Sequence, residues 1–381
     1  MLIAVFIIND IINYCIKLFV MSIRKSLRFC YKKILISLFQ YIYPKPTKFF
    51  KFKNYKYIKI NNGKDKRCNY KIYKENNVRV YTDDLYNLSV IKNNSLISNL
   101  SIQLDQKGIK KNINENEIFK KGTPKFKHKI KGPILVAAQG ASGYNYFHWF
   151  FDILPKIYLA NKIYDLNYFN FFYLPEIKYD YQIQTLKRLK IPKRKILSSK
   201  RIKFFSTDEI VLTEHPYFRK NFWWDNYKSI PKWIVKFNTN KFKSISKKNF
   251  KKGKKIFIDR TDTKHPHNQI SNIKEIYKII KKNNFEIVKL TEKKFSDQVS
   301  IFKNANTILA PHGAGLKNII YCKKKSTIIE LKEKKFMNNY LYQHLSKLCG
   351  LSHTSINSKK YVKNKMFIDT NYLKKILKKY E

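Results

Sequence analysis

The chain has 381 residues, of which 44% are hydrophobic, and its formal net charge is +53 at pH 7. This length predicts one large or two medium domains, and the apolar content is sufficient for packed cores. Lysine supplies most of the charge, but no nucleic-acid-binding module accompanies it, which argues against nucleic acid and favours an anionic membrane surface or an anionic glycan as partner. The joint excess of Lys, Asn, Ile, Tyr and Phe is also what an A+T-rich coding sequence would produce, with the charge then lying on solvated faces.

Residues 1–43 are predicted to form a hydrophobic and basic amphipathic segment. Asn9, Asn13 and Lys17 interrupt its first half, whereas a membrane-spanning helix needs about twenty mostly apolar residues. No small-residue cleavage site follows, and Met21 is an alternative start. Residues 22–43 alternate basic and apolar side chains, which predicts a helix that binds a membrane surface; a helix packed on the domain is the alternative.

An N-terminal domain is expected at 44–250, starting with a linker and short antiparallel strands. A buried strand at 134–138 and a small-residue loop at 139–143 lead into a helix at 144–160, which Pro155 should kink or shorten. The aromatic cluster at 222–224 could stack on a sugar or a base, or fill a core.

His148 and Asp152 lie four residues apart in the predicted helix and therefore share one of its faces. A carboxylate beside an imidazole orients the ring and supports its protonated form, which suits a general base. A structural histidine with a satisfied partner is the alternative for such a bare pair.

A second domain is expected at 251–360, followed by a C-terminal helix at 361–381. Its first strand ends at Arg260, where a guanidinium can hold a diphosphate with two donors. Asp262, His265 and His267 crowd the next loop, but no further ligand stands at a recognisable spacing, so we predict no metal site.

Residues 305–331 read as a strand, a glycine turn, a short helix at 316–321 and a second strand, which is the pattern of a parallel α/β unit. Gly313 and Gly315 allow backbone N–H groups to approach a ligand, and the helix directs its positive end to the same place, so the turn predicts a phosphate site. His312 adds a donor beside it. Glu330 ends the next strand, where it could hold a ribose hydroxyl.

The five cysteines are scattered and contain no C-x-x-C pair, which fits free thiols in a reducing cytoplasm. We therefore expect a cytoplasmic protein, with peripheral binding at the inner face of the membrane left open.

Three stretches of the sequence together resemble glycosyltransferase family 61. They are GYNYFHWFFDILPKIYLA at 143–160, KIFIDR at 255–260 and FSDQVSIFKNANTILAPHGAGLKNIIY at 295–321, which STIIEL at 326–331 follows. Order and spacing agree over residues 130–350. Members of the family look like the capsule and cell-wall sugar transferases of bacteria and the xylan and O-glycan transferases of eukaryotes.

The resemblance implies an α/β fold of GT-B type, with two Rossmann-like domains facing across a cleft. It makes 44–250 the acceptor-side domain and 251–360 the nucleotide-sugar-binding domain. It also implies an inverting transfer of a hexosyl or pentosyl group from a nucleotide sugar to a glycan acceptor. We expect a cell-surface or capsular polysaccharide, with a lipid-linked acceptor left open.

The family motifs also assign roles to residues of this chain. His148 and Asp152 match the histidine and aspartate of the helix motif and are the expected catalytic pair, with the choice of base between them open; Asn145 and Trp149 fall on the acceptor side. The expected donor-binding residues are Arg260, His312, Gly313, Ala314, Gly315 and Glu330. The chain departs from the family at Asn268 and Gln269, where a basic pair is frequent, at Ile273, and at Lys317, where threonine is usual.

The sequence contains no Asp-x-Asp, so we expect fixed positive groups, rather than a metal ion or another cofactor, to stabilise the departing diphosphate. One alternative is a non-catalytic glycan- or nucleotide-binding protein on the same fold. A lysine-dependent nucleic-acid-binding protein is another, and its binding should weaken steeply with salt.

Overall fold

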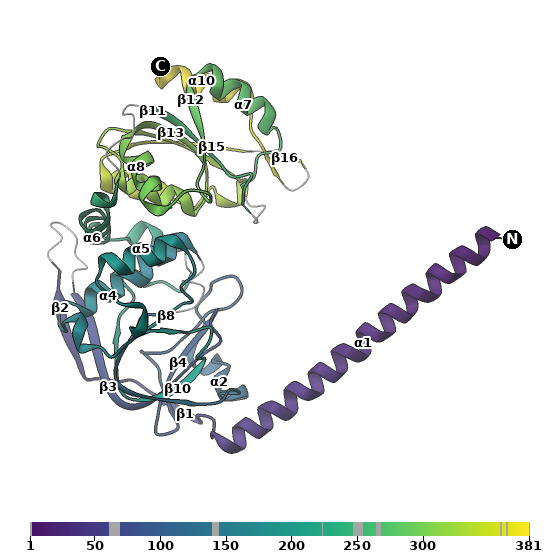
Figure 1. The fold of residues 1–381 in the computed structure, drawn as a ribbon, viewed down its shortest axis with the longest axis vertical. Coiled ribbons are helices and arrows are strands. Elements are labelled where there is room, and N and C mark those ends of the chain that lie inside the picture. The colour runs from purple at the N-terminus through teal and green to yellow at the C-terminus, as the bar shows by residue number, and fades with distance from the viewer. Residues whose placement is uncertain are drawn as a thin grey trace.

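The computed structural model describes residues 2–60, 69–138, 145–222, 224–246, 254–263, 268–358, 360–362 and 365–380. The loop predicted at 139–143, the aromatic residue Trp223, and His265 and His267 lie outside these ranges. The described chain is a mixed α/β protein with two large sheets, each in a lobe of its own, and a long N-terminal helix (Figure 1).

The sheet of the N-terminal lobe follows the order β1-β5-β4-β3-β10-β7-β8-β9, with β2 paired to β3 and β6 paired to β4. Its strands are β1 (Lys48–Phe50), β2 (Tyr55–Lys59), β3 (Asn69–Thr82), β4 (Asn87–Lys92), β5 (Ser95–Ile97), β6 (Ile102–Gln103), β7 (His128–Val136), β8 (Phe171–Leu174), β9 (Ile196–Ser198) and β10 (Phe204–Thr213). β3 pairs antiparallel with β4 and β10. The four strands β10, β7, β8 and β9 run parallel to one another. The parallel half is therefore the part that can offer strand ends to a ligand.

The helices of this lobe lie on both halves of the sheet, with Ile118 packed against β4 and β5 in the antiparallel half. They are α2 (Ile118–Lys121), α3 (Tyr146–His148), α4 (Leu154–Ala160), α5 (Asp180–Arg188) and α6 (Lys232–Phe242), with short 3₁₀ turns at Ile113–Glu115, Leu166–Tyr168, Lys193–Lys195, Trp224–Ser229 and Lys243–Ile245. A π-helical turn, Trp149–Ile153, joins α3 to α4. Pro155 stands in the first turn of α4 and offers no N–H to the carbonyl four residues earlier, which accounts for the interruption of the predicted helix.

The C-terminal lobe contains a parallel sheet in the order β12-β11-β13-β14-β15. Its elements are β11 (Lys254–Asp259), α7 (Ile273–Lys282), β12 (Phe285–Lys289), α8 (Phe295–Asn304), β13 (Ala305–Pro311), the 3₁₀ helix η7 (Ala314–Tyr321), β14 (Thr327–Lys332), a 3₁₀ turn at Lys334–Phe336, α9 (Leu341–Cys349), β15 (Ser352–Asn357), the hairpin β16 (Lys360–Val362) and β17 (Lys365–Phe367), α10 (Thr370–Leu377) and a final turn at Lys378–Tyr380. Helices connect successive parallel strands, as in a Rossmann-like fold. The C-terminal helix α10 packs in one apolar cluster with α7, so it belongs to this lobe.

Two predicted helices of the chain differ from the structure. The segment after the glycine turn is a 3₁₀ helix, as suits a short stretch that is buried on all sides from Leu316 to Tyr321. The helix predicted at 144–160 is divided into α3, the π-helical turn Trp149–Ile153 and α4.

A hydrophobic cluster runs continuously from one lobe into the other. Across their junction the Tyr146 hydroxyl donates to Asn318 Oδ1 at 2.8 Å, and the rings of Phe150 and Phe295 lie 5.1 Å apart. The amide of Phe295 also donates to Asp180 Oδ2 at 2.7 Å. These contacts hold the helix that carries His148 against the lobe that carries the glycine turn.

α1 (Leu2–Ile42) is one helix that leaves the body of the molecule (Figure 1). Leu27, Tyr31 and Ile34 are each more than 60% exposed, whereas Phe39 near its end is buried against Phe126. Among the side chains of α1 that the structure describes, the buried contact with the body lies near the end of the helix, and membrane binding stays a prediction. In the described part of the chain no helix combines the length and apolarity needed to cross a membrane.

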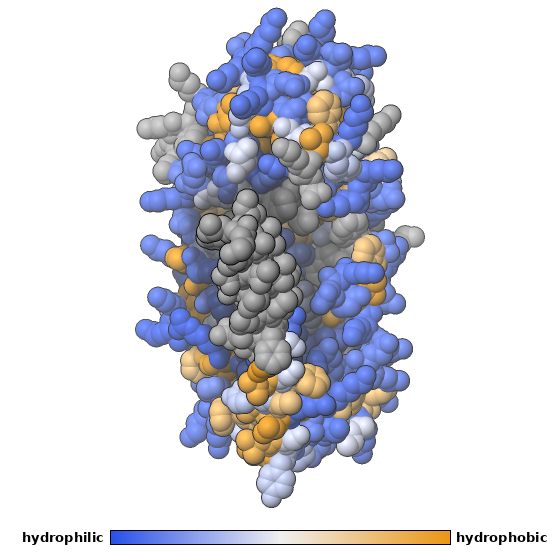
Figure 2. All heavy atoms as spheres, turned by 90° about the vertical axis from the view of Figure 1, so that its right-hand side faces the viewer, coloured by the Kyte–Doolittle hydropathy of each residue, from blue (hydrophilic) through white to orange (hydrophobic). Residues whose placement is uncertain are grey.

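Hydrophilic residues cover most of the face seen in Figure 2, as the lysine-rich composition requires. Apolar side chains gather in its lower part, where α1 joins the body (Figure 2). Cys30, Cys322 and Cys349 are free thiols.

Candidate active site

In the N-terminal lobe, His148 and Asp152 are in contact, as their spacing predicted. His148 Nδ1 lies 2.7 Å from Asp152 Oδ2, and the imidazole keeps 15% of its surface exposed while Asp152 is buried. The other carboxylate oxygen accepts a hydrogen bond from the Tyr217 hydroxyl at 2.6 Å. His215 Nε2 lies 3.6 Å from the same oxygen. One buried carboxylate therefore orients two imidazoles and a phenol.

The buried cluster fixes the charge states of its members. Burial opposes ionisation of Asp152, but the charge and hydrogen bond of His148 and the contact with His215 bring its pKa below the ordinary value. Burial lowers the pKa of His215 to about 4, despite the opposing effect of Asp152. It also lowers the pKa of Lys156, four residues after Asp152, to about 8. At neutral pH His215 is uncharged and Asp152 is ionised, which suits the orientation of His148.

The predicted acceptor-side residues Asn145 and Trp149 both make hydrogen bonds within the N-terminal lobe. The exposed Asn145 caps α3, where its side chain accepts from the Phe147 amide at 2.8 Å. Trp149 is fully buried, and its indole N–H donates to Thr185 Oγ1 at 2.9 Å. An acceptor therefore finds no exposed surface on Trp149, whereas Asn145 stands open at the entrance to the helix.

In the C-terminal lobe, Arg260 and Gly313 lie against each other. A Cβ atom at position 313 would come within 1.7 Å of Nη1 of Arg260, so only glycine leaves room for this guanidinium. Gly313 has extended backbone angles that any residue adopts, and it is therefore required for space rather than for conformation. Gly315 is likewise close-packed, with Leu290 Cδ1 at 2.7 Å from the position of a Cβ atom.

Arg260 is half-buried and its Nε atom is fully buried, and no carboxylate of the described residues forms an ion pair with it. Its Nε atom has no hydrogen-bond partner, and burial lowers its pKa although Tyr342, Asp262 and Glu333 oppose the effect. The neighbouring Asp259 accepts instead from Thr261 and Tyr277. A buried donor group of this kind is ready to bind an anion, since an unpaired buried polar group is costly.

His312 and Glu330 form the second imidazole–carboxylate pair, with His312 Nδ1 at 2.5 Å from Glu330 Oε1. The second oxygen of Glu330 lies 3.0 Å from His353 Nε2 and 3.5 Å from Lys332 Nζ. Burial would raise the pKa of Glu330, but the hydrogen bonds from His312 and His353 lower it to about 2. Both oxygens of Glu330 are engaged by other side chains and the residue is fully buried, which leaves no exposed carboxylate oxygen for the predicted contact with a ribose hydroxyl.

The His312 ring is itself held in place. It stacks on Phe336 with ring centroids 4.8 Å apart, and it lies 5.1 Å from the ring of Tyr342. The Tyr342 hydroxyl donates to the carbonyl of Gly313 at 2.5 Å. Ala314, the first residue of η7, is partly exposed beside this turn. The predicted donor residues thus form one cluster at the carboxyl ends of β11, β13 and β14.

Part of the chain matches the model of a known protein family. Residues 146–329 match the family model of Glycosyltransferase 61. This part of the chain belongs to glycosyltransferase family 61. The matched range contains both His148 and Asp152 and the whole of the glycine turn. No curated protein matches the chain in a sequence search. The chain therefore carries a glycosyltransferase domain on a Rossmann-like α/β fold.

The two clusters also contain residues that sequence reasoning missed. His215 and Tyr217 reach Asp152 from the segment after β10, and Tyr342 reaches Gly313 from α9. Burial raises the pKa of both Tyr217 and Tyr342, and the charge of Tyr227 adds to the rise in each, so Tyr227 lies within electrostatic reach of both clusters. The position of His215 just beyond a strand of the parallel half was the available signal, since strand ends are where ligands bind.

Proposed function

We propose that the protein is an inverting glycosyltransferase of GT-B architecture that moves a hexosyl or pentosyl group from a nucleotide sugar to a glycan. A cell-surface or capsular polysaccharide is the proposed acceptor. The two-lobed arrangement supports the GT-B assignment, because one lobe carries the imidazole–carboxylate pair and the other carries the glycine turn with Arg260 against it. The proposal extends beyond the family assignment to the reaction.

Arg260 carries the proposal. Its Nε atom is buried without a partner beside Gly313, and a diphosphate supplies the paired oxygens that a guanidinium binds best. Glu330 holds His312 on the other side of the turn. We place the donor diphosphate against Arg260 and His312, beside the turn in which Gly313 leaves room for the Arg260 guanidinium.

The reaction step follows from the other lobe. Asp152 engages Nδ1 of His148, so Nε2 takes the proton of the acceptor hydroxyl. The hydroxyl oxygen forms a bond to the anomeric carbon while the bond from that carbon to the diphosphate oxygen breaks. Attack from the face opposite the leaving group inverts the anomeric configuration. Arg260 stabilises the charge that develops on the leaving diphosphate.

We propose that this step needs no metal ion. The sequence lacks an Asp-x-Asp, and Arg260 and His312 are fixed donors at the place where the diphosphate charge develops. Donor hydrolysis that continues in excess EDTA supports this part of the proposal, whereas activity that returns only with added Mn²⁺ or Mg²⁺ overturns it.

The function is tested by screening nucleotide sugars for a rise in melting temperature, followed by donor hydrolysis without acceptor. Arg260→Met should abolish the thermal shift and the hydrolysis, whereas Arg194→Lys, a surface change, should alter neither. A protein that binds donors without hydrolysing or transferring any of them would instead be a non-catalytic nucleotide-binding member of the fold. Binding that ignores nucleotide diphosphates and weakens steeply with salt would indicate nucleic acid.

We further propose that α1 binds the protein peripherally to an anionic cytoplasmic membrane surface, where lipid-linked acceptors would be found. Its exposed apolar residues alternate with Lys25, Arg28, Lys32 and Lys33. Each basic residue near the surface contributes about 1 kcal/mol. Co-sedimentation with phosphatidylserine vesicles should be lost in a chain beginning at Lys45; equal co-sedimentation of the two proteins overturns the proposal.

A further inference from the structure

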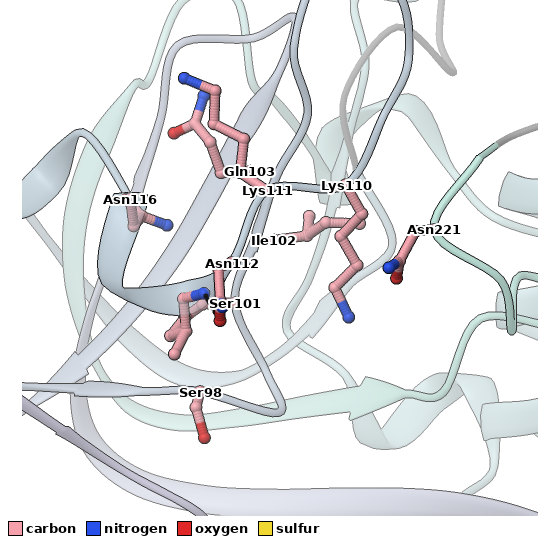
Figure 3. Close-up of a pocket in the computed structure, with 10 residues that line it drawn as sticks. Ser98, Ser101, Ile102, Gln103, Lys110, Lys111, Asn112, Asn116 and Asn221 are labelled. Carbon is pink, nitrogen blue, oxygen red and sulfur yellow. Dashed lines mark hydrogen bonds between the residues drawn. The ribbon is translucent and has the colours of Figure 1, made fainter.

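A polar pocket of about 340 Å³ lies in the N-terminal lobe, and all of its lining except Asn221 precedes the stretch that matches the family (Figure 3). Its lining residues are Ser98, Ser101, Ile102, Gln103, Lys110, Lys111, Asn112, Ile113, Asn116 and Asn221. Hydroxyls, amides and ammonium groups predominate in this lining. The volume lies at the low end of the range for small-molecule sites, and it is suited to a compact polar ligand.

Asn116 gives the pocket an unsatisfied donor. The side chain is 1% exposed, and its Oδ1 accepts from Asn87 Nδ2 and from the Ile118 amide, both at 3.0 Å. These two donors fix the orientation of the amide group, because a flipped amide would face them with its own hydrogens. Nδ2 is then a buried donor without a partner, and it points toward Ile102 in Figure 3. A ligand oxygen is the group that this position lacks.

Charge and donors also predominate on the opposite side. Figure 3 shows the ammonium group of Lys110 and the amide of Asn221 beside each other, across the pocket from Asn116. No described acidic residue lines the pocket, and no ion pair joins Lys110 or Lys111 to a carboxylate in the described part of the chain. The pocket therefore favours a ligand that offers several oxygen acceptors and a negative charge.

The pocket is connected with the candidate catalytic cluster through one short segment. Tyr217, which donates to Asp152, stands four residues before Asn221, and four residues span at most about 14 Å. The amide of Lys110 donates to the carbonyl of Asn221 at 2.9 Å, which ties the two sides of the pocket together. A few residues of backbone therefore separate the pocket lining from the candidate catalytic cluster.

We propose that this pocket binds an anionic sugar unit of the glycan acceptor, at a distance from the unit that receives the transferred sugar. Lys110 and the Asn116 amide hold its charged group and a neighbouring oxygen, and Asn221 holds a hydroxyl. The anionic group is a carboxylate or a phosphate ester. The identification of the glycan as the acceptor rests on the proposed function, whereas the binding of an anionic sugar does not.

Three sugars that differ only at C6 test the pocket: glucuronate, glucose 6-phosphate and glucose. Each is titrated at 150 mM salt into protein labelled with ¹⁵N-asparagine, and the Asn116 side-chain signal is assigned by its loss in Asn116→Asp. The anionic sugars should shift this signal saturably, and the tighter of the two identifies the anionic group. Glucose should bind roughly tenfold more weakly, since it lacks a charge-assisted hydrogen bond.

Lys110→Gln should weaken the binding of the anionic sugars roughly tenfold. Lys107→Gln removes the same charge from the same exposed turn, outside the pocket lining, and should leave binding unchanged. Equal effects of the two substitutions would mean that the protein attracts anions only through its net charge, and would overturn the proposal. Equal binding of glucose, or no movement of the Asn116 signal, would overturn it as well.

The titration contains no nucleotide sugar, so its result is independent of transfer. Loss of anionic-sugar binding in a protein that hydrolyses its donor overturns the pocket and leaves the proposed function standing. A protein that binds the anionic sugars but neither binds nor hydrolyses any donor overturns the proposed function and leaves the pocket standing.

Discussion

The two lobes each bury one carboxylate between two histidines and a lysine, yet the two clusters differ in what they leave accessible. Asp152 and Glu330 both have a lowered pKa and a short contact to the Nδ1 atom of a histidine. In the N-terminal lobe His148 keeps 15% of its side chain exposed. In the C-terminal lobe His312 is packed against two aromatic rings and is only 9% exposed.

The difference indicates two tasks for the same pair of side chains. An imidazole that takes a proton from a substrate must be accessible to that substrate. An imidazole that positions a diphosphate can be held rigidly by packing. The route through the chain differs too: His148 and Asp152 are four residues apart on one helix, whereas His312 and Glu330 meet across two parallel strands. We therefore expect changes in the first cluster to affect turnover and changes in the second to affect donor binding.

The largest effect is expected for His148→Ala. If His148 takes the acceptor proton, kcat should fall by about two to four orders of magnitude, while donor affinity measured by calorimetry should barely change. His128→Ala replaces an exposed histidine of β7 and should leave both quantities unchanged.

Asp152→Asn refines this prediction. It should reduce kcat less, and the acid limb of the pH profile should move to lower pH, because the imidazolium of His148 loses its stabilising charge. If Asp152→Asn proves the more damaging change, Asp152 is the base and His148 positions the acceptor. Near-wild-type turnover in both variants would mean that neither His148 nor Asp152 takes part in catalysis.

Gly313→Val tests the second cluster. Its side chain would occupy the place of the Arg260 guanidinium, so nucleoside diphosphate affinity should fall at least roughly tenfold, as expected for lost charge-assisted hydrogen bonds. Gly350→Ala introduces strain at the left-handed C-cap of α9, outside the donor cluster, so it separates lost stability, measured as the melting temperature of both variants, from lost binding. Unchanged diphosphate affinity in a folded Gly313→Val would sink the assignment of the donor site.

The two clusters should also lose stability in different pH ranges. His215 binds a proton at pH 6.5 when unfolded but only near pH 4 when folded, so the unfolded state gains protons first and stability falls as the pH drops from 6.5 to 4. Glu330 has a pKa of 4.5 in its ordinary state and about 2 in the fold, so its contribution is lost as the pH falls from 4.5 to 2. Each shift corresponds to about 3 kcal/mol.

Urea unfolding from pH 7 to pH 3 measures these contributions. His215→Gln should flatten the upper range and Glu330→Gln the lower one, whereas His128→Gln should follow the wild type throughout. A wild-type slope that persists in both cluster variants would show that other groups govern the acid sensitivity.

The sequence predicted most of what local patterns encode. The parallel α/β order of the C-terminal lobe and the pairing of His148 with Asp152 could be read from periodicity and spacing, whereas the presence of Arg260 near the glycine turn was implied by the family resemblance. The contacts of His215 and Tyr217 could not, because they depend on how the chain returns after β10. The engagement of both Glu330 oxygens by side chains from neighbouring strands was equally inaccessible, since strand order is not visible in one sequence.

The junction between the lobes contains a lysine, Lys317, whose burial could not be predicted from the sequence. Lys317 has no exposed surface, and its Nζ atom lies 3.2 Å from the ring centroid of Phe150 and 3.0 Å from Asn318 Oδ1. The Tyr146 hydroxyl is 3.3 Å away. No carboxylate accompanies it in the described part of the chain, and burial places its pKa well below the ordinary value.

The smallest effect is therefore expected for Lys317→Met, measured as the free energy of unfolding in urea at pH 7 and pH 9. Burial lowers the pKa of Lys317 in the fold, so the unfolded state binds this proton more tightly and wild-type stability should rise with pH through this group. Lys317→Met lacks that slope and should be the more stable protein at pH 7, with the difference narrowing at pH 9. Lys278→Met, on the exposed face of α7, should show no such change.

If Lys317→Met is less stable than the wild type at both pH values, the aromatic rings hold a charged ammonium. A stable variant with reduced kcat would show that Lys317 sets how the two clusters face each other, because neither cluster contains it.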